Sequence, residues 1–281
     1  MSEDLLTLTE TDRRIDDLVA GAGEIVTAYL EQDSGCVSYV VDQGGQRLFV
    51  KCAVTESGEA SLGRAAALHR TIRHPALPAL LHTLRTGSGP AQIYPWVPGD
   101  VLYDYVTMDG AAGRRDPASA HARFRALPIA RILAALDAIY DLHVRIAEAG
   151  FIAVDFYDGC ILYDFDAHRT WVCDLDEYRP GPFRLVEDRL PGSRRFMAPE
   201  EFVRGSTIDQ RTNVYTLGQA AALLLGDGYL DSDTWRGAAE ASAVLRRATA
   251  WEREHRYATV VAFVMAWRRA IRQLTAEDET C

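Results

Sequence analysis

The sequence predicts a bilobal α+β protein, with a small antiparallel β-sheet and one main helix first and a mostly helical part after them. Two observations carry this prediction. Apolar residues alternate with a period of two over much of residues 24–53, which is typical of half-buried strands. Residues 128–149 follow a helical period between Pro128 and Gly150, residue types that favour a helix start and stop. We expect an N-terminal helical extension over 1–22 and two further parts over 23–97 and 98–281.

The first part should contain five strands and one helix. Three strands are expected within 24–53, because Asp33-Ser34-Gly35 and Gly44-Gly45 are turn-forming breaks. A helix over 58–73 should end before His74-Pro75, since the residue before proline disfavours helix. Two more strands are expected within 77–86 and 91–97.

The second part should be built on the helix over 128–149. Short β segments are expected within 151–156, 160–165 and 170–176, followed by a loop to Pro199 and by helices to the end of the chain. Residues 109–120 contain glycine, proline and several small residues, and they predict a mobile surface insertion.

Charge and cysteine content exclude several classes of protein. The chain has 281 residues and a net charge of −10, so a nucleic acid is not an expected partner. No apolar run is long enough to span a bilayer, and the acidic N-terminal residues do not resemble a signal peptide. The five cysteines contain no C-x-x-C pair, which argues against a disulfide framework or a zinc site. We therefore expect a cytoplasmic protein without a membrane partner.

Lys51 is the only lysine in a chain that otherwise uses arginine. An ammonium is a compact charge and a guanidinium is a planar fork, so the two are not interchangeable. A position that retains lysine in this background is a candidate for a chemical role, although chance could also leave one lysine.

A series of short motifs follows Lys51 in a fixed order. They are His74-Pro75, the segment 93–99, Val154-Asp155, Cys173-Asp174-Leu175-Asp176, Gly192-Ser193 with Ala198-Pro199-Glu200, Asn213 to Gly218, and Arg256. Together these residues resemble the protein kinase pattern from about residue 24 to residue 270. Each match alone is weak, and the order and spacing carry the resemblance.

The resemblance implies a protein kinase-like fold that uses ATP and Mg²⁺. It implies Asp155 as the catalytic base and Lys51 as the residue that holds the phosphates. Nucleotide-binding positions would be Lys51, Gly35, Val37, Tyr94, Pro95, Val97 and Leu162. Metal ligands would be Asp174, Asp176 and, as a weaker candidate, Asp158. Asp158 and Asp176 could instead cap turns.

Several positions depart from the family pattern. Gly35 stands alone where the family has three glycines, and Ala65 occupies the position of the glutamate that pairs with the lysine; Glu59 is the nearest acid. Cys160 replaces an asparagine, and a thiol is a poor ligand for Mg²⁺. Val154 replaces the arginine that receives an activating phosphate, which argues against that mode of regulation.

Three functions remain open at this stage. The first is a serine/threonine protein kinase-like enzyme that phosphorylates a protein hydroxyl. The second is a phosphotransferase that acts on a small-molecule hydroxyl, such as an antibiotic or a metabolite. The third is a catalytically inactive pseudokinase that binds nucleotide or a partner protein. The acceptor and the oligomeric state do not follow from the sequence.

Overall fold

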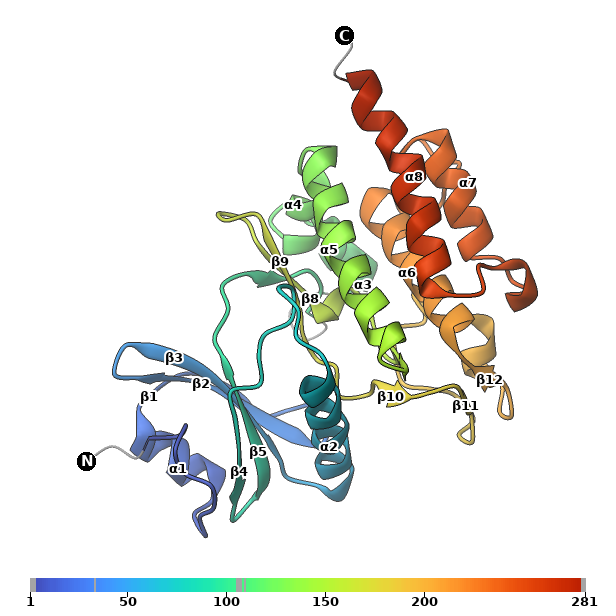
Figure 1. Ribbon diagram of the computed structural model, residues 1–281. Coiled ribbons are helices and arrows are strands. Elements are labelled where there is room, and N and C mark those ends of the chain that lie inside the picture. The colour runs from blue at the N-terminus through green and yellow to red at the C-terminus, as the bar shows by residue number, and fades with distance from the viewer. Residues whose placement is uncertain (1–3, 33, 105–107, 109, 279–281) are drawn as a thin grey trace. The chain divides into compact units, whose positions relative to one another are not determined.

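The computed structural model describes residues 4–32, 34–104, 108 and 110–278 (Figure 1). Its internal contacts divide the chain into two units, Met1–Val97 and Pro98–Cys281, and each is described by itself below. A five-stranded antiparallel sheet and several helices confirm a protein of mixed helix and sheet.

The first unit is built on the five-stranded sheet. Its strands are β1 (Glu24–Tyr29), β2 (Cys36–Gln43), β3 (Gln46–Ala53), β4 (His82–Thr86) and β5 (Gly89–Pro95), in the spatial order β1-β2-β3-β5-β4. The expected three-strand meander is confirmed. Gly44 and Gly45 both have positive φ, at 65° and 90°, and they connect β2 to β3 in a two-residue hairpin.

The two helices of this unit cover opposite faces of the sheet. Helix α1 (Ile15–Ala22) packs on the face that presents Leu48, Val50 and Cys52 of β3. Helix α2 (Glu56–Thr71) packs on the other face, where its Leu62 contacts Cys36 and Ala53. The Thr55 hydroxyl caps α2 by accepting a hydrogen bond from the Gly58 N–H at 3.1 Å. Since side chains alternate along a strand, Lys51 belongs to the α2 face.

The expected N-terminal helix is wrong for the described residues before Ile15. Residues 4–14 form turns and one bridge between Glu10 and Arg85 of β4. Thr7, Thr9 and Thr11 alternate with other residues in this stretch, and β-branched residues at a period of two favour extended backbone.

The second unit is mainly helical. Its helices are α3 (Gly110–Arg115), α4 (Ala120–Ala126), α5 (Ile129–Glu148), α6 (Gln210–Leu225), α7 (Ala239–Ala248) and α8 (Val260–Asp278). Tyr140 of α5 is fully buried and donates a hydrogen bond to the Leu217 carbonyl of α6 at 3.0 Å. Its ring also meets Phe263 and Trp267 of α8 edge-on, so one aromatic side chain joins three helices.

The segment expected as a mobile insertion contains helix α3, while residue 109 lies outside the described residues. Alanine and arginine at 111–112 and 114–115 have high helix propensity, which outweighs the two glycines.

Short strands and single 3₁₀ turns connect the helices of this unit. A three-stranded sheet contains β6 (Asp100–Val101), β8 (Ile161–Asp164) and β9 (Arg169–Val172). The strand pairs are β7 (Phe151–Ile152) with β10 (Arg179–Pro180) and β11 (Phe183–Arg184) with β12 (Thr207–Ile208). The turns are η1 (Asp158–Cys160), η2 (Pro199–Phe202) and η3 (Arg253–His255). Across the described ranges, no helix is both long and apolar enough to cross a membrane.

Candidate functional site

Asp155 lies in a loop that runs from β7 to β8, which we call the 155–160 loop. Asn213, near the start of α6, holds the residues that precede Asp155. The Asn213 side chain accepts a hydrogen bond from the Ala153 N–H at 2.9 Å and donates one to the Ala153 carbonyl at 2.6 Å. Asp155 itself has φ of 63°, a left-handed conformation that is uncommon for a residue with a side chain. The local backbone is therefore fixed in an unfavourable conformation by contacts with the helical part.

Cys160 connects Asp155 to the strand that leads to Asp174. Its buried thiol lies 3.2 Å from the Asp155 carbonyl oxygen, to which it donates. The Cys160 carbonyl accepts the N–H of Cys173 at 2.9 Å. Burial raises the pKa of the Cys160 thiol well above its usual range, and the nearby Asp174 raises it further. A protonated thiol suits the role of a hydrogen-bond donor that braces the loop, rather than that of a metal ligand.

Three acids of the second unit act by charge on Asp155. Burial raises the pKa of Asp155 to about 7, and repulsion from Asp174, Glu177 and Asp176 adds to the shift. Asp176 is buried, and Asp174 is exposed and shares the left-handed backbone of Asp155, with φ of 60°. The predicted residues Asp174 and Asp176 are thus close enough to Asp155 to act on it by charge.

Glu177 is a member of this acid group that sequence reasoning missed. It directly follows Asp176, and the run of acids in Asp174-Leu175-Asp176-Glu177 was the available signal. Glu177 also forms an ion pair with Arg179, in which Nη2 of Arg179 lies 3.0 Å from Oε2 of Glu177, so part of the Glu177 charge is balanced locally.

A segment comprising residues 189–197, which we call the 189–197 segment, packs against Asp155. A Cβ atom built on Gly192 would lie 3.4 Å from Oδ1 of Asp155. Arg189 lowers the pKa of Asp155 by its charge, and its guanidinium donates to the carbonyls of Leu190 and Gly192. Gly192 has φ of 135°, so a side chain there would be both crowded and strained.

Asp158 faces the same segment from within the 155–160 loop. Its side chain has no exposed surface, and Nη2 of Arg195 lies 2.7 Å from each of its two oxygens. The prediction that Asp158 binds a metal remains a prediction, with both oxygens engaged by this cation.

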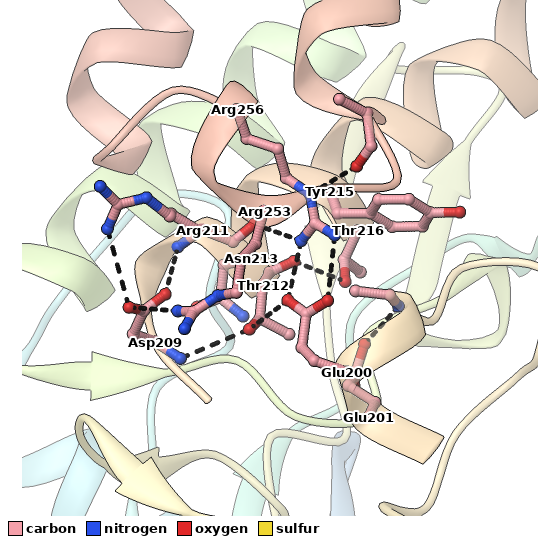
Figure 2. Close-up of polar contacts among 12 residues, drawn as sticks. Glu200, Glu201, Asp209, Arg211, Thr212, Asn213, Tyr215, Thr216, Arg253 and Arg256 are labelled. Carbon is pink, nitrogen blue, oxygen red and sulfur yellow. Dashed lines mark hydrogen bonds and ion pairs between the residues drawn. The ribbon is translucent and has the colours of Figure 1, made fainter. Parts of the chain in front are cut away.

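Glu200, which follows the 189–197 segment in the sequence, forms a hydrogen-bonded ion pair with Arg256 (Figure 2). Arg256 Nη1 and Nη2 donate to the two Glu200 oxygens at 2.7 and 3.0 Å. The remaining Arg256 donors reach the carbonyls of Ala250, Trp251 and Arg211. Thr212 donates to Glu200 at 2.8 Å, which completes a buried network between η2 and α6. This pair fixes the end of the 189–197 segment to the helices.

Glu201 shows a different solution for a buried acid. Burial raises its pKa to about 8, although its carboxyl group accepts a hydrogen bond from the Ala198 N–H at 2.6 Å. Glu201 is therefore mostly protonated at neutral pH, whereas its neighbour Glu200 has the Arg256 guanidinium.

Lys51 is nearly buried in the first unit, with 7% of its surface exposed. In the strand register it lies between Ser38 of β2 and Gln92 of β5, both also buried. Gln92 donates to the Leu62 carbonyl of α2 at 2.6 Å and accepts from the Tyr94 hydroxyl at 2.6 Å. Lys51 and Tyr94 thus share one polar face of the sheet.

The other predicted nucleotide positions of this unit do not all join that face. Val37 pairs with Cys52, one residue out of phase with Lys51, and it packs with the cluster on the α1 face. Val40, which the sequence reasoning did not select, shares the Lys51 face by strand alternation and is buried. Pro95 pairs with Leu48, while Val97 is half-buried after the last strand.

Gly35 has φ of 71°, and a Cβ there would lie 2.0 Å from the Thr55 hydroxyl oxygen. Its small size is therefore explained by close packing against the start of α2. Ala65 is buried on α2, and Glu59 is half-exposed and pairs with Arg85 of β4 at 3.1 Å. In the second unit, Leu162 of β8 is mostly buried between Val101 and Trp171.

The donor set at the acid group fits Mg²⁺ only as a partial site. Carboxylates are hard oxygen ligands, and Mg²⁺ commonly combines one or two of them with phosphate oxygens and water. In the described part of the chain, no group of three or more histidine, cysteine, aspartate or glutamate side chains is arranged to hold a metal by itself. Asp174 and Asp176 would therefore hold a metal together with a phosphorylated ligand.

Comparison of the chain with models of protein families and with curated proteins gives no match.

Proposed function

We propose that this chain is an ATP-dependent phosphotransferase of protein kinase-like fold that moves the γ-phosphate to a hydroxyl group of a protein. The observation that carries the proposal is the braced, left-handed Asp155 beside Asp174 and Asp176. A base with a pKa near the working pH is suited to accept a proton from a hydroxyl.

The proposed reaction assigns one task to each group. The acceptor oxygen attacks the γ-phosphorus, its proton passes to a carboxylate oxygen of Asp155, and the bond to the β–γ bridging oxygen breaks to release ADP. When bound, Mg²⁺ would neutralise phosphate charge, with Asp174 and Asp176 as its carboxylate ligands. Lys51 would contact the phosphates from the sheet.

Residues around the proposed base support a protein acceptor over a small one. Gly192 lies next to Asp155, and the Glu200–Arg256 network fixes the chain beyond it. An ordered segment beside the base is a surface on which an extended peptide can rest.

The test of the proposal is transfer of labelled γ-phosphate from ATP to the chain itself or to a generic protein acceptor. Asp155→Asn should lower the rate at least about 100-fold, because the base is lost. Lys51→Met should raise the KM for ATP about tenfold or more. Arg47→Met is the matched control, because Arg47 is an exposed cation on the same strand, paired with Asp42 at 3.6 Å. Unchanged ATP kinetics in Lys51→Met would refute the nucleotide assignment.

A second candidate, a pseudokinase, is favoured by the surroundings of α2. Ala65 is buried where a glutamate partner for Lys51 would stand, and Glu59 is engaged by Arg85. This candidate predicts no turnover of ATP with any acceptor, with or without Mg²⁺. A small-molecule enzyme differs from both, because it should consume ATP only when its own acceptor is added.

A further inference from the structure

Arg195 and Asp158 join two parts of the second unit that are far apart in the sequence. Asp158 belongs to the 155–160 loop and Arg195 to the 189–197 segment. The carboxylate has no exposed surface, and a buried charge is costly unless a counter-charge and hydrogen bonds accompany it. A single guanidinium nitrogen, 2.7 Å from both oxygens, supplies that counter-charge.

Arg195 is the cation best placed to serve Asp158. His121 of α4 lies 3.8 Å from the carboxylate, but burial lowers the pKa of His121 to about 4, so its ring is neutral at physiological pH. Arg114 of α3 is close enough to interact with Asp158 by charge, yet no hydrogen bond of the described structure joins the two. The carboxylate therefore depends on Arg195.

Aromatic rings hold the Arg195 guanidinium in its position. Its central carbon lies 5.4 Å from the ring centre of Tyr103 and 5.2 Å from that of Phe196. A guanidinium between aromatic faces gains cation–π attraction and loses freedom to turn away. The neighbouring Arg194 is exposed and lies 6.0 Å from the ring of Phe202.

Moving Arg195 would move the surroundings of the proposed base. Phe196 follows Arg195, and its ring centre lies 6.5 Å from that of Tyr157. Gly192, three residues before Arg195, lies next to Asp155. Two residues separate Asp158 from Asp155 in the loop. The ion pair is thus the shortest charged link between the loop that carries the base and the segment that borders it.

We propose that Arg195 is a positioning residue, which holds the 189–197 segment against the 155–160 loop through its ion pair with Asp158. This ion pair keeps the surface beside Asp155 ordered, so that no phosphate group on the 189–197 segment is needed for that purpose. The catalytic part of this inference rests on the proposed function. The structural part, that the ion pair orders the segment, does not.

Backbone hydrogen exchange tests the structural part without any activity. The Phe196 N–H donates to the Ser193 carbonyl and the Leu190 N–H to the Glu201 carbonyl, each at 2.9 Å, so these amides report on the segment. Arg195→Met should speed exchange of peptides covering 189–197 at least tenfold and leave those of α5 unchanged. Arg194→Met is the matched control and should behave as the wild type. Equal protection in Arg195→Met and wild type would overturn the proposal.

Phosphotransfer kinetics test the positioning role. Arg195→Met should lower kcat or raise the KM for the acceptor at least tenfold and leave the KM for ATP unchanged. Arg195→Lys should restore most of the activity, because one nitrogen makes both contacts with Asp158. If Arg195→Met does not fold, Asp158→Asn is measured in its place and should give the same exchange and the same kinetics.

Two further outcomes are decisive. If Asp158→Asn changes the Mg²⁺ requirement and leaves exchange of the segment unchanged, Asp158 is a metal ligand and the positioning role of Arg195 is refuted. If the wild type transfers no phosphate at all, the proposed function fails, while the exchange experiment still decides whether the ion pair orders the segment.

Discussion

Two groups of acids in the second unit lie in opposite electrostatic surroundings. Glu200 is paired with Arg256 through two hydrogen bonds, and the donors of Arg256 described above all have acceptors. Asp155 lies among Asp174, Asp176 and Glu177, and this proximity helps to raise its pKa to about 7. The carboxylate of the first group is balanced by a cation, whereas neighbouring negative charges raise the pKa of Asp155 in the second group.

The difference separates stability from chemistry. A satisfied buried pair fixes the chain, because both of its charges are engaged in hydrogen bonds. An acid with a raised pKa opposes folding when it ionises, so it is retained at a cost and is a candidate for function. The comparison predicts opposite responses when each group is neutralised or truncated.

Removing the cation of the balanced pair should have the largest effect. Arg256→Met leaves Glu200 buried without its guanidinium, and this should lower the free energy of unfolding by about 3–5 kcal/mol. Urea denaturation followed by circular dichroism measures it. Arg145→Ala is the control, since its pair with Glu148 is exposed and should contribute about 0.5 kcal/mol or less. A loss below about 1 kcal/mol in Arg256→Met would show that the pair does not fix this region.

The second largest loss of stability is expected at Asn213, whose side chain holds the backbone of Ala153 before Asp155. Asn213→Ala removes both hydrogen bonds to Ala153 and leaves buried backbone groups without these partners, at a cost of about 2 kcal/mol. Gln219→Ala, on the same helix, removes one 3.2 Å contact with Tyr215 and should cost less than about 1 kcal/mol. Equal costs for the two variants would mean that Asn213 has no special role in holding the loop.

Neutralising Asp155 should stabilise the protein and do so only at higher pH. Its folded pKa of about 7 exceeds the ordinary value of 3.8, so ionisation opposes folding increasingly as the pH rises from about 4 to 7. Asp155→Asn should therefore match the wild type near pH 4 and exceed its free energy of unfolding at pH 8. The gain should be roughly 1–2 kcal/mol, less than the roughly 4 kcal/mol of the full shift, because Asp155 is partly exposed and water screens its charge. Thermal unfolding across this range measures the difference. A pH-independent effect of Asp155→Asn would contradict the assignment.

The hydrogen bond from the Cys160 thiol to the Asp155 carbonyl should contribute least to the free energy of unfolding. Cys160→Ala removes the hydrogen bond to the Asp155 carbonyl and a buried sulfur, and should lower the free energy of unfolding by about 1 kcal/mol. Cys173→Ala affects a half-buried thiol with a longer contact of 3.5 Å, so its cost should be smaller. The reverse order, measured by urea denaturation, would place the brace at Cys173.

The sequence predicted elements whose cause is local. Period-two alternation and the Gly44-Gly45 turn were sufficient for the β2–β3 hairpin, and Pro128 and Gly150 bracket α5 closely. The predicted N-terminal helix covers only Ile15–Ala22, because threonine alternation before it favours extended backbone. Helix α3 within 109–120 was missed, because the helix propensity of alanine and arginine was underweighted.

The candidate site was predictable where residues are close in sequence and not where the fold joins them. Asp174 and Asp176 follow from one short motif. The link between Asp158 and Arg195 spans 37 residues, and no spacing rule indicates it. The opposite faces of Val37 and Lys51 depend on strand register, since a shift by one residue reverses every side chain.

The solitary ε-amine on β3 offers a practical consequence. Because Lys51 is the only lysine, reductive methylation with carbon-13 formaldehyde would label one side chain of the protein. Its dimethylamine resonance would report directly on whatever approaches that buried position, such as a triphosphate or a metal complex. The α-amino group of the chain would be labelled as well, so the single side-chain signal can be assigned to Lys51 by comparison with Lys51→Met.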